Sequence, residues 1–132
     1  MISSHSTTST LHSRPILVVD DNRDAVDMTA IMLRERGYSV AIAYSAFEAV
    51  DWLDRNTHIA MIISDIRMPE VDGFDFLRLV RKRFPTLPMV LMTGLPITAK
   101  DFIPRGASIL QKPFTIEELQ RMISRHLHAD AP

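Results

Sequence analysis

Five polar residues that can do chemistry stand at or just after the ends of short apolar runs: Asp20, Asp21, Asp65, Thr93 and Lys112. A carboxylate can attack phosphorus as a nucleophile and form a mixed anhydride, as it does in aspartyl-phosphate ATPases. Phosphoryl transfer otherwise needs mainly positioning and neutralisation of the phosphate oxygens, which a metal ion, an ammonium group and a hydroxyl can provide. These residue types therefore indicate phosphoryl-transfer chemistry, with Asp65 as the predicted acceptor.

Charge balance predicts a metal ion among these residues. Carboxylates a few ångströms apart in a partly dry cleft repel one another strongly, so three of them need a counter-charge. Mg²⁺ suits the cleft because it takes oxygen ligands and keeps several waters. We therefore expect Asp20, Asp21 and Asp65 to hold Mg²⁺. Lys112 is expected to pair first with the acceptor carboxylate and then with the phosphate, while Thr93 hydrogen-bonds a phosphate oxygen.

The elements that must position these residues show up as short apolar runs alternating with longer amphipathic ones. Mostly continuous apolar runs are typical of parallel strands covered on both faces, and apolar residues at helical spacing predict helices. The predicted strands are Ile16–Val19, Tyr38–Ala43, Ile59–Ile63, Met89–Met92 and Ser108–Leu110, and the predicted helices are Arg23–Arg36, Ala46–Asn56, Gly73–Phe84 and Ile116–Leu127. Because crossovers between parallel strands are right-handed, we expect an open, doubly wound α/β sheet with its polar residues at the carboxyl ends of the strands.

Local signals mark several helix ends. Ser45 with Glu48, and Thr115 with Glu118, have the spacing of a capping box, in which each side chain bonds a free backbone N–H. Gly37 is expected to close the first helix, because glycine readily adopts the left-handed conformation that ends helices.

Composition narrows the function. The chain has 132 residues, enough for one domain, and its formal net charge of −1 without a basic run argues against direct binding to nucleic acid. The absence of cysteine excludes disulfides and thiol catalysis. The apolar runs are far shorter than the roughly 20 residues of a membrane span, so no membrane association is expected. We predict a flexible tail over residues 1–13, one domain over 14–128, a disordered end over 129–132 and a cytoplasmic location.

Taken together, four short motifs resemble those of two-component response-regulator receiver domains. They are Ile16–Asp21 (ILVVDD), Ser64–Pro69 (SDIRMP) with Asp72-Gly73 after it, Met92–Gly94 (MTG) and Lys112–Phe114 (KPF). Each motif alone is weakly specific, whereas all of them in this order at strand ends are highly specific. The resemblance covers Arg14 to Leu127 and suggests a single-domain, chemotaxis-regulator-like member of that family.

The resemblance implies a flavodoxin-like strand order of 2-1-3-4-5 and a phosphoryl group accepted on Asp65 from a histidine kinase or a phosphotransfer protein. It implies that Asp21 and the backbone carbonyl of Arg67 bind Mg²⁺ directly, while Asp20 acts mostly through water. The Lys112-Pro113 bond is expected to be cis. No enzyme activity is implied beyond the domain's own phosphorylation and dephosphorylation. The phosphate would switch binding to a downstream protein that the sequence does not identify, and a weak homodimer is a further option.

Two departures from the family pattern bear on the switch. Receivers usually carry an aromatic residue three positions before the lysine, which rotates inward behind the residue matching Thr93, but here that position is Ile109. The segment before strand five is a few residues shorter than usual, and Pro96 and Pro104 leave room for only a shortened fourth helix. This surface commonly docks partners, so a partner of this chain has the first helix as an alternative.

Three classes of function remain open. The first is the phosphorylated switch. The second is a receiver-like interaction module that does not switch by the usual Thr/aromatic mechanism and binds its partner equally with and without phosphate. The third is a small phosphohydrolase with an Asp nucleophile, but such enzymes usually place a second acid two residues beyond the nucleophile, where this chain has Arg67.

Each residue alone also has a simpler explanation. An Asp-Asp pair after a strand is often just a helix cap, and Lys112 alone would be a surface lysine before a turn. Asp72-Gly73 is interpreted as shaping the entry to a helix rather than as catalytic. The succession of these residues after consecutive strands is what favours a functional site.

Overall fold

The computed structural model describes residues 14–55, 58–68, 71–94 and 107–127. Strands and helices follow one another along the chain in the predicted alternation. Their bounds are β1 Ile16–Val19, α2 Arg23–Glu35, β2 Val40–Ala43, α3 Ala46–Arg55, β3 Met61–Asp65, α4 Gly73–Arg83, β4 Met89–Thr93, β5 Ala107–Gln111 and α5 Ile116–Leu127. Among these described residues, no helix is long and apolar enough to cross a membrane.

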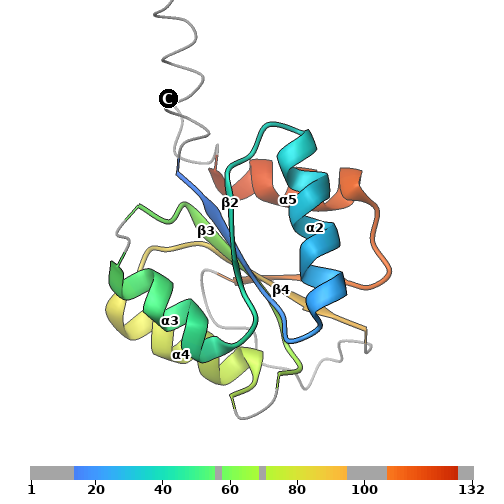
Figure 1. Ribbon diagram of the computed structural model, residues 1–132. Helices are drawn as coiled ribbons and strands as arrows, with labels where there is room; N and C mark the ends of the chain where they lie inside the picture. The colour runs from blue at the N-terminus through green and yellow to red at the C-terminus, as the bar shows by residue number, and fades with distance from the viewer. Residues whose placement is uncertain (1–13, 56–57, 69–70, 95–106, 128–132) are drawn as a thin grey trace, which may run out of the picture.

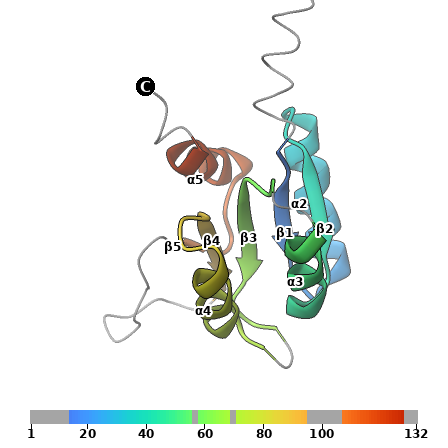
Figure 2. The same ribbon diagram turned by 90° about the vertical axis from the view of Figure 1, so that its left-hand side faces the viewer.

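The five strands form one parallel sheet in the order β2-β1-β3-β4-β5 (Figures 1 and 2), which confirms the predicted fold and strand order. Strand β1 lies between β2 and β3, with Val19 paired to Ala43 on one side and to Ser64 on the other. Because neighbouring strands end at matching register, the residues that follow them emerge at one edge of the sheet. The functional residues predicted from the sequence all belong to that edge.

Helices cover both faces of the sheet, with α2 and α5 on one face and α3 and α4 on the other (Figures 1 and 2). Successive strand residues point to opposite faces, so Ile16 and Val18 pack in the core under α2 and α5, whereas Leu17 and Val19 pack under α3 and α4. All four side chains are at most 1% exposed. Two buried cores therefore hold β1 and fix the position of whatever follows it.

The helix-end signals of the sequence are largely realised. Gly37 has a φ of 91°, and the N–H groups of Gly37 and Tyr38 donate to the carbonyls of Arg34 and Leu33, which is a Schellman motif. Thr115 and Glu118 form the complete capping box.

The other predicted capping box is only half formed. The Glu48 N–H donates to Ser45 Oγ as expected, but Glu48 Oε1 accepts from the N–H of Tyr44, one residue earlier than the box requires. Both bonds still satisfy backbone groups at the start of α3, so the helix is capped by a variant of the predicted arrangement.

Strand bounds differ most from the prediction at β2 and β3. The sequence places the start of β3 at Ile59, whereas the strand runs from Met61 to Asp65 and includes the predicted acceptor itself. Ile59 and Ala60 are buried but do not belong to the strand. The prediction is wrong here because an apolar run indicates that residues are buried and does not show whether they pair with a neighbouring strand. The shortened fourth helix predicted between Pro96 and Pro104 lies outside the described residues.

The start of α4 makes a close backbone contact next to Asp65, the predicted acceptor. Asp72 caps this helix by accepting from the N–H of Asp75, and the Gly73 N–H donates to the Ile66 carbonyl at 2.6 Å. A Cβ atom on Gly73 would lie 2.7 Å from Ile66 Cα and 2.9 Å from the Asp65 carbonyl oxygen. Glycine is therefore required here to let α4 approach the end of β3.

We predict that Gly73→Ala destabilises the protein, because the added methyl group must push backbone atoms apart. A loss of about 1 to 3 kcal/mol in the free energy of unfolding is expected for such overpacking. Urea denaturation followed by circular dichroism measures it. Gly94→Ala is the matched control, since a Cβ there meets nothing within 4 Å; equal stability of the two variants would contradict this explanation.

Candidate functional site

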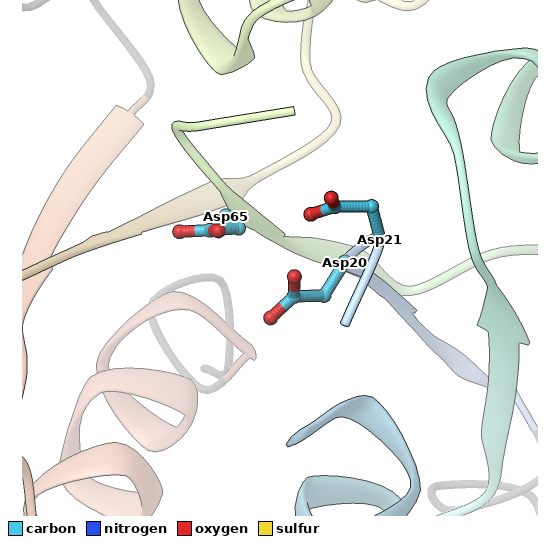
Figure 3. Close-up of side chains that lie close together, drawn as sticks. All are labelled: Asp20, Asp21 and Asp65. Carbon is cyan, nitrogen blue, oxygen red and sulfur yellow. The ribbon is translucent and has the colours of Figure 1, made fainter. Parts of the chain in front are cut away.

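The three predicted metal ligands converge at the carboxyl edge of the sheet. Asp20 and Asp21 directly follow β1 and Asp65 ends β3, and Figure 3 shows their carboxylates grouped around one space. One oxygen from each of the three lies within 4.8 Å of the others. Asp20 is buried, Asp65 is half-buried and Asp21 is exposed, so the cluster opens to solvent on one side. The sequence prediction that these residues meet is confirmed.

Lys112 supplies the positive charge expected beside Asp65, the predicted acceptor. Its Nζ lies 3.4 Å from Asp65 Oδ1 and 3.9 Å from Asp20 Oδ2. The Lys112 N–H donates to the Thr93 carbonyl at 2.6 Å, which holds the lysine against the end of β4. The Lys112-Pro113 peptide is cis, as expected. Thr93, only 4% exposed, therefore lies at the same edge as the carboxylates and beside the lysine backbone.

The simpler explanation of the Asp-Asp pair as a helix cap does not hold. The N-cap of α2 is Asn22, whose side chain accepts from the Ala25 N–H at 3.1 Å. Asp20 Oδ1 accepts from the Asn22 N–H at 3.1 Å, which orients the carboxylate without capping the helix. The second oxygen of Asp20 and the carboxylate of Asp21 thus remain available to a ligand.

Burial makes Asp20 a weaker acid than an ordinary aspartate. Loss of solvation raises the pKa of its carboxyl from 3.8 to about 6, and the nearby Asp65 and Asp21 carboxylates push it in the same direction. The Asn22 N–H and the Lys112 ammonium lower the pKa but do not offset the burial. Near neutral pH the charged form of Asp20 is therefore held at a cost, which a bound cation relieves.

The donor set fits Mg²⁺. Three carboxylates present only oxygen ligands, the exposed position of Asp21 leaves room for the waters that Mg²⁺ retains, and one ammonium group cannot balance three negative charges. Acidic triads of this kind are typical of the Mg²⁺ site of receiver domains. The direct contacts of Asp21 and of the Arg67 backbone carbonyl stay a prediction.

An open groove of about 560 Å³ adjoins the cluster and begins at Asp21. Ile66, Arg67, Met68 and Phe74 form most of its wall. Arg67 is exposed here, so its side chain is accessible from solvent. The groove therefore reaches the carboxylate cluster at Asp21 from the side of α4.

One network near the site escaped the sequence interpretation. Tyr44, which follows β2, donates through its hydroxyl to Asp27 of α2 at 2.9 Å. The Arg23 guanidinium lies 4.0 Å from the centre of the Tyr44 ring. These contacts tie the start of α2 to the end of β2 and so support the loop that carries Asp20 and Asp21. No local motif marks them, because the partners are about twenty residues apart in the chain.

The geometry and the comparisons with known proteins agree. Residues 16–124 match the family model of the response regulator receiver domain. The chain belongs to the response regulator receiver family. It is therefore a receiver domain of two-component signalling, and Asp20, Asp21 and Asp65 make its acidic pocket.

Relatives of similar length and longer ones both match this receiver domain. An "uncharacterized 14.6 kDa protein" of Leptolyngbya boryana is 34% identical over 131 residues, covering 93% of this chain and 97% of that protein. Response regulator Rre1 of Synechocystis sp. is 34% identical over 114 residues, covering 82% of this chain. A solved receiver domain protein from Clostridium thermocellum superposes with a TM-score of 0.78 at 28% identity, covering 87% of this chain and 94% of that one.

Some relatives extend well beyond the matched part. The aligned region spans 49% of Rre1 and 55% of the regulatory protein VanRc of Enterococcus gallinarum. The chain thus spans about half the length of these curated relatives, and the similarity concerns the receiver part that they share.

We predict that Asp20→Asn stabilises the metal-free receiver at pH 7 to 8. The folded pKa of Asp20 lies above its unfolded value, so its contribution to stability is fully present below the unfolded pKa and is lost as pH rises through about 6. The Asn side chain does not ionise, so the variant avoids this loss. Its free energy of unfolding at pH 7 to 8 should be higher by roughly 1 to 3 kcal/mol. Thermal melts in EDTA from pH 5 to 8 measure the effect.

The same melts contain their own tests. The stabilisation by Asp20→Asn should shrink as pH falls below 6. It should reverse when Mg²⁺ is added, because the variant has one negative charge fewer at the predicted metal site. Asp51→Asn is the control, since its exposed pair with Arg55 contributes little. If Asp20→Asn were less stable than the unmodified protein in EDTA at pH 8, the buried negative charge of Asp20 would not destabilise the fold, and the prediction would be wrong.

Proposed function

We propose that this receiver accepts a phosphoryl group on Asp65, with Mg²⁺ held by Asp20, Asp21, Asp65 and the backbone carbonyl of Arg67. The observation that carries the proposal is the Lys112 ammonium 3.4 Å from Asp65 Oδ1, beside two further carboxylates within metal-binding reach. An ammonium beside Asp65 offsets part of the negative charge of the cluster, and the same positive charge serves the phosphate afterwards.

The reaction needs little from the protein beyond positioning and charge. One carboxylate oxygen of Asp65 attacks the phosphorus of a phosphohistidine, the P–N bond breaks, and the donor histidine keeps the electron pair and takes a proton. Lys112 neutralises an oxygen of the transferred group, and the Thr93 hydroxyl donates to another. Bound Mg²⁺ supplies charge neutralisation for the remaining oxygens. Attack of water on the same phosphorus later returns the free carboxylate.

The partners follow from the same proposal. Receiver domains generally work with a histidine kinase, and a kinase or a phosphotransfer protein is the proposed donor here. The phosphate is proposed to change binding to a downstream protein. The cytoplasmic location and the absence of direct contact with nucleic acid stay predictions from the sequence.

Intact-mass spectrometry after treatment with acetyl phosphate and Mg²⁺ tests the proposal. We expect a single phosphate adduct that hydroxylamine removes, that needs Mg²⁺, and that is absent from Asp65→Asn. Asp75→Asn is the control, because Asp75 is an exposed residue of α4 that pairs with Arg78. An adduct retained by Asp65→Asn, or none with either a small donor or a phosphorylated kinase, would refute the acceptor role.

Lys112→Ala tests, in the same assay, whether the ammonium group stabilises the transferred phosphoryl group or contributes to Mg²⁺ binding. Removing the ammonium should slow adduct formation by about a hundredfold, the usual cost of losing one transition-state stabiliser. Mg²⁺ affinity should rise at the same time, because a positive charge leaves the carboxylates. If the rate of adduct formation and the affinity for Mg²⁺ both fell, Lys112 would act only by stabilising the fold.

A second candidate, a receiver that switches without the usual aromatic rotation and so differs from a non-switching interaction module, is favoured by one observation. Ile109 is half-buried on β5, paired with Leu91 of β4, and packs against the core under α3 and α4. An isoleucine held in this way has no ring to exchange between exposed and buried positions. The output is then proposed to depend on Thr93 and Lys112 without an aromatic relay.

Methyl and amide NMR spectra with Mg²⁺ and beryllofluoride, a phosphoryl analogue, test this candidate. We expect large shifts for the Thr93 and Lys112 amides and little change at the Ile109 methyl groups. Ile42 methyl groups on the distant edge strand β2 serve as the baseline. A large shift or a rotamer change at Ile109 would show that the usual rearrangement takes place with an aliphatic residue.

A further inference from the structure

Strand β2 forms one edge of the five-stranded sheet, because among the described residues only β1 pairs with it (Figure 2). An edge strand carries backbone N–H and C=O groups that point away from the sheet and can pair with another chain. The segment Tyr38–Tyr44, which contains β2, has the sequence YSVAIAY, without charge, proline or glycine. Short, uncharged segments of high β-propensity pair readily with copies of themselves. The edge of the sheet therefore carries a segment suited to self-pairing.

The register of β2 shows which of its carbonyls point outward. The carbonyls of Ser39 and Ala43 accept from N–H groups of β1 and of the residue that follows it, so they point toward β1. Successive carbonyls of a strand point to opposite edges, so those of Val40 and Ile42 point away from the sheet. A strand that joined this edge would have to donate to these two carbonyls.

Both outward carbonyls already accept hydrogen bonds from side chains. Arg34, in the last turn of α2, donates through Nη2 to the Val40 carbonyl at 2.9 Å. Trp52 of α3 donates through Nε1 to the Ile42 carbonyl at 3.1 Å. Because α2 and α3 cover opposite faces of the sheet, the edge is capped once from each face (Figure 2).

The N–H group just beyond the strand is bonded in the same way. Tyr44 follows β2, and its N–H donates to Glu48 Oε1 of α3 at 2.9 Å. The three bonded residues, Val40, Ile42 and Tyr44, are spaced by two, which is the period at which a strand presents its groups to one side. Side chains of the two flanking helices thus follow the edge along its length.

Burial of the strand alone does not account for these bonds. Val40 and Ala41 are at most 9% exposed, but this protects the faces of β2 and leaves its edge open to pairing. The indole N–H of the half-buried Trp52 needs an acceptor in any case. Arg34 is exposed, and water could solvate its guanidinium, so its bond to the Val40 carbonyl is not a consequence of burial.

We propose that the β2 edge is a latent self-pairing surface and that Arg34 and Trp52 keep it closed. The partner that fits this edge is a second copy of the chain, whose Tyr38–Tyr44 segment would pair with the same segment about a two-fold axis. The guanidinium and the indole compete with the N–H groups of the incoming strand for the outward carbonyls. The weak homodimer considered from the sequence is therefore not expected to use this edge while both caps are present.

Sedimentation velocity of Arg34→Met/Trp52→Phe over a range of concentrations tests the proposal. The two substitutions remove the donors and keep much of the apolar bulk of both side chains. We expect the variant to dimerise reversibly, with an association constant at least about tenfold above that of the unmodified protein, the effect of about one net hydrogen bond. Arg78→Met loses the same charge on α4, which contributes no cap to β2, and should behave as the unmodified protein.

Two further variants separate loss of the caps from loss of stability. Arg34→Met alone changes an exposed side chain and should show the same effect more weakly, even if the double variant does not fold. Gly73→Ala, which is expected to weaken the fold beside β3, should not dimerise.

Hydrogen exchange locates the contact. The amides of Val40 and Ile42 point to the same edge as their carbonyls, so their exchange in the double variant should slow as protein concentration rises. No dimer in either capping variant, a dimer without protection of these two amides, or equal dimerisation of Gly73→Ala would overturn the proposal. The measurements are made in EDTA without a phosphodonor, so their outcome is independent of Asp65 phosphorylation.

Discussion

The repulsion among three carboxylates at one edge of the sheet is the constraint on which the rest of the site depends. In water, side chains with these charges would stay apart. Here the parallel pairing of β1 and β3 fixes the ends of the two strands next to each other, so the carboxylates cannot separate. Core packing on both faces of β1 stabilises the arrangement, and Lys112 offsets part of the repulsion. Burial adds to the cost of the negative charge at Asp20, because lost solvation, more than the neighbouring carboxylates, raises the pKa of this carboxyl to about 6. A site strained in this way is prepared to bind positive charge.

The fold could be predicted from the sequence because parallel strands buried on both faces produce continuous apolar runs. The site could be predicted because Asp20, Asp21, Asp65, Thr93 and Lys112 each stand where such a run ends, and a parallel sheet brings those ends together. Features set by long-range contacts could not be predicted. The approach of Gly73 to the Ile66 backbone and the Tyr44–Asp27 hydrogen bond depend on how helices pack on the finished sheet. The start of β3 was misplaced for a related reason, since Ile59 and Ala60 are buried by their neighbours without being paired as a strand.

If the proposed phosphorylation of Asp65 switches this receiver, Ile109 in place of an aromatic residue requires a different element to carry the signal. A switch requires a part of the structure that changes its contacts when phosphate arrives, and a rotamer change of an isoleucine moves far less volume than a ring does. Strands β4 and β5 are paired along their length, and just beyond that pairing the Lys112 N–H donates a 2.6 Å hydrogen bond to the Thr93 carbonyl. A phosphate that draws both the Thr93 hydroxyl and the Lys112 ammonium acts on the two residues joined by that bond. The change would then pass along the β4–β5 pair as a shift of backbone, without the exchange of a side chain between solvent and core.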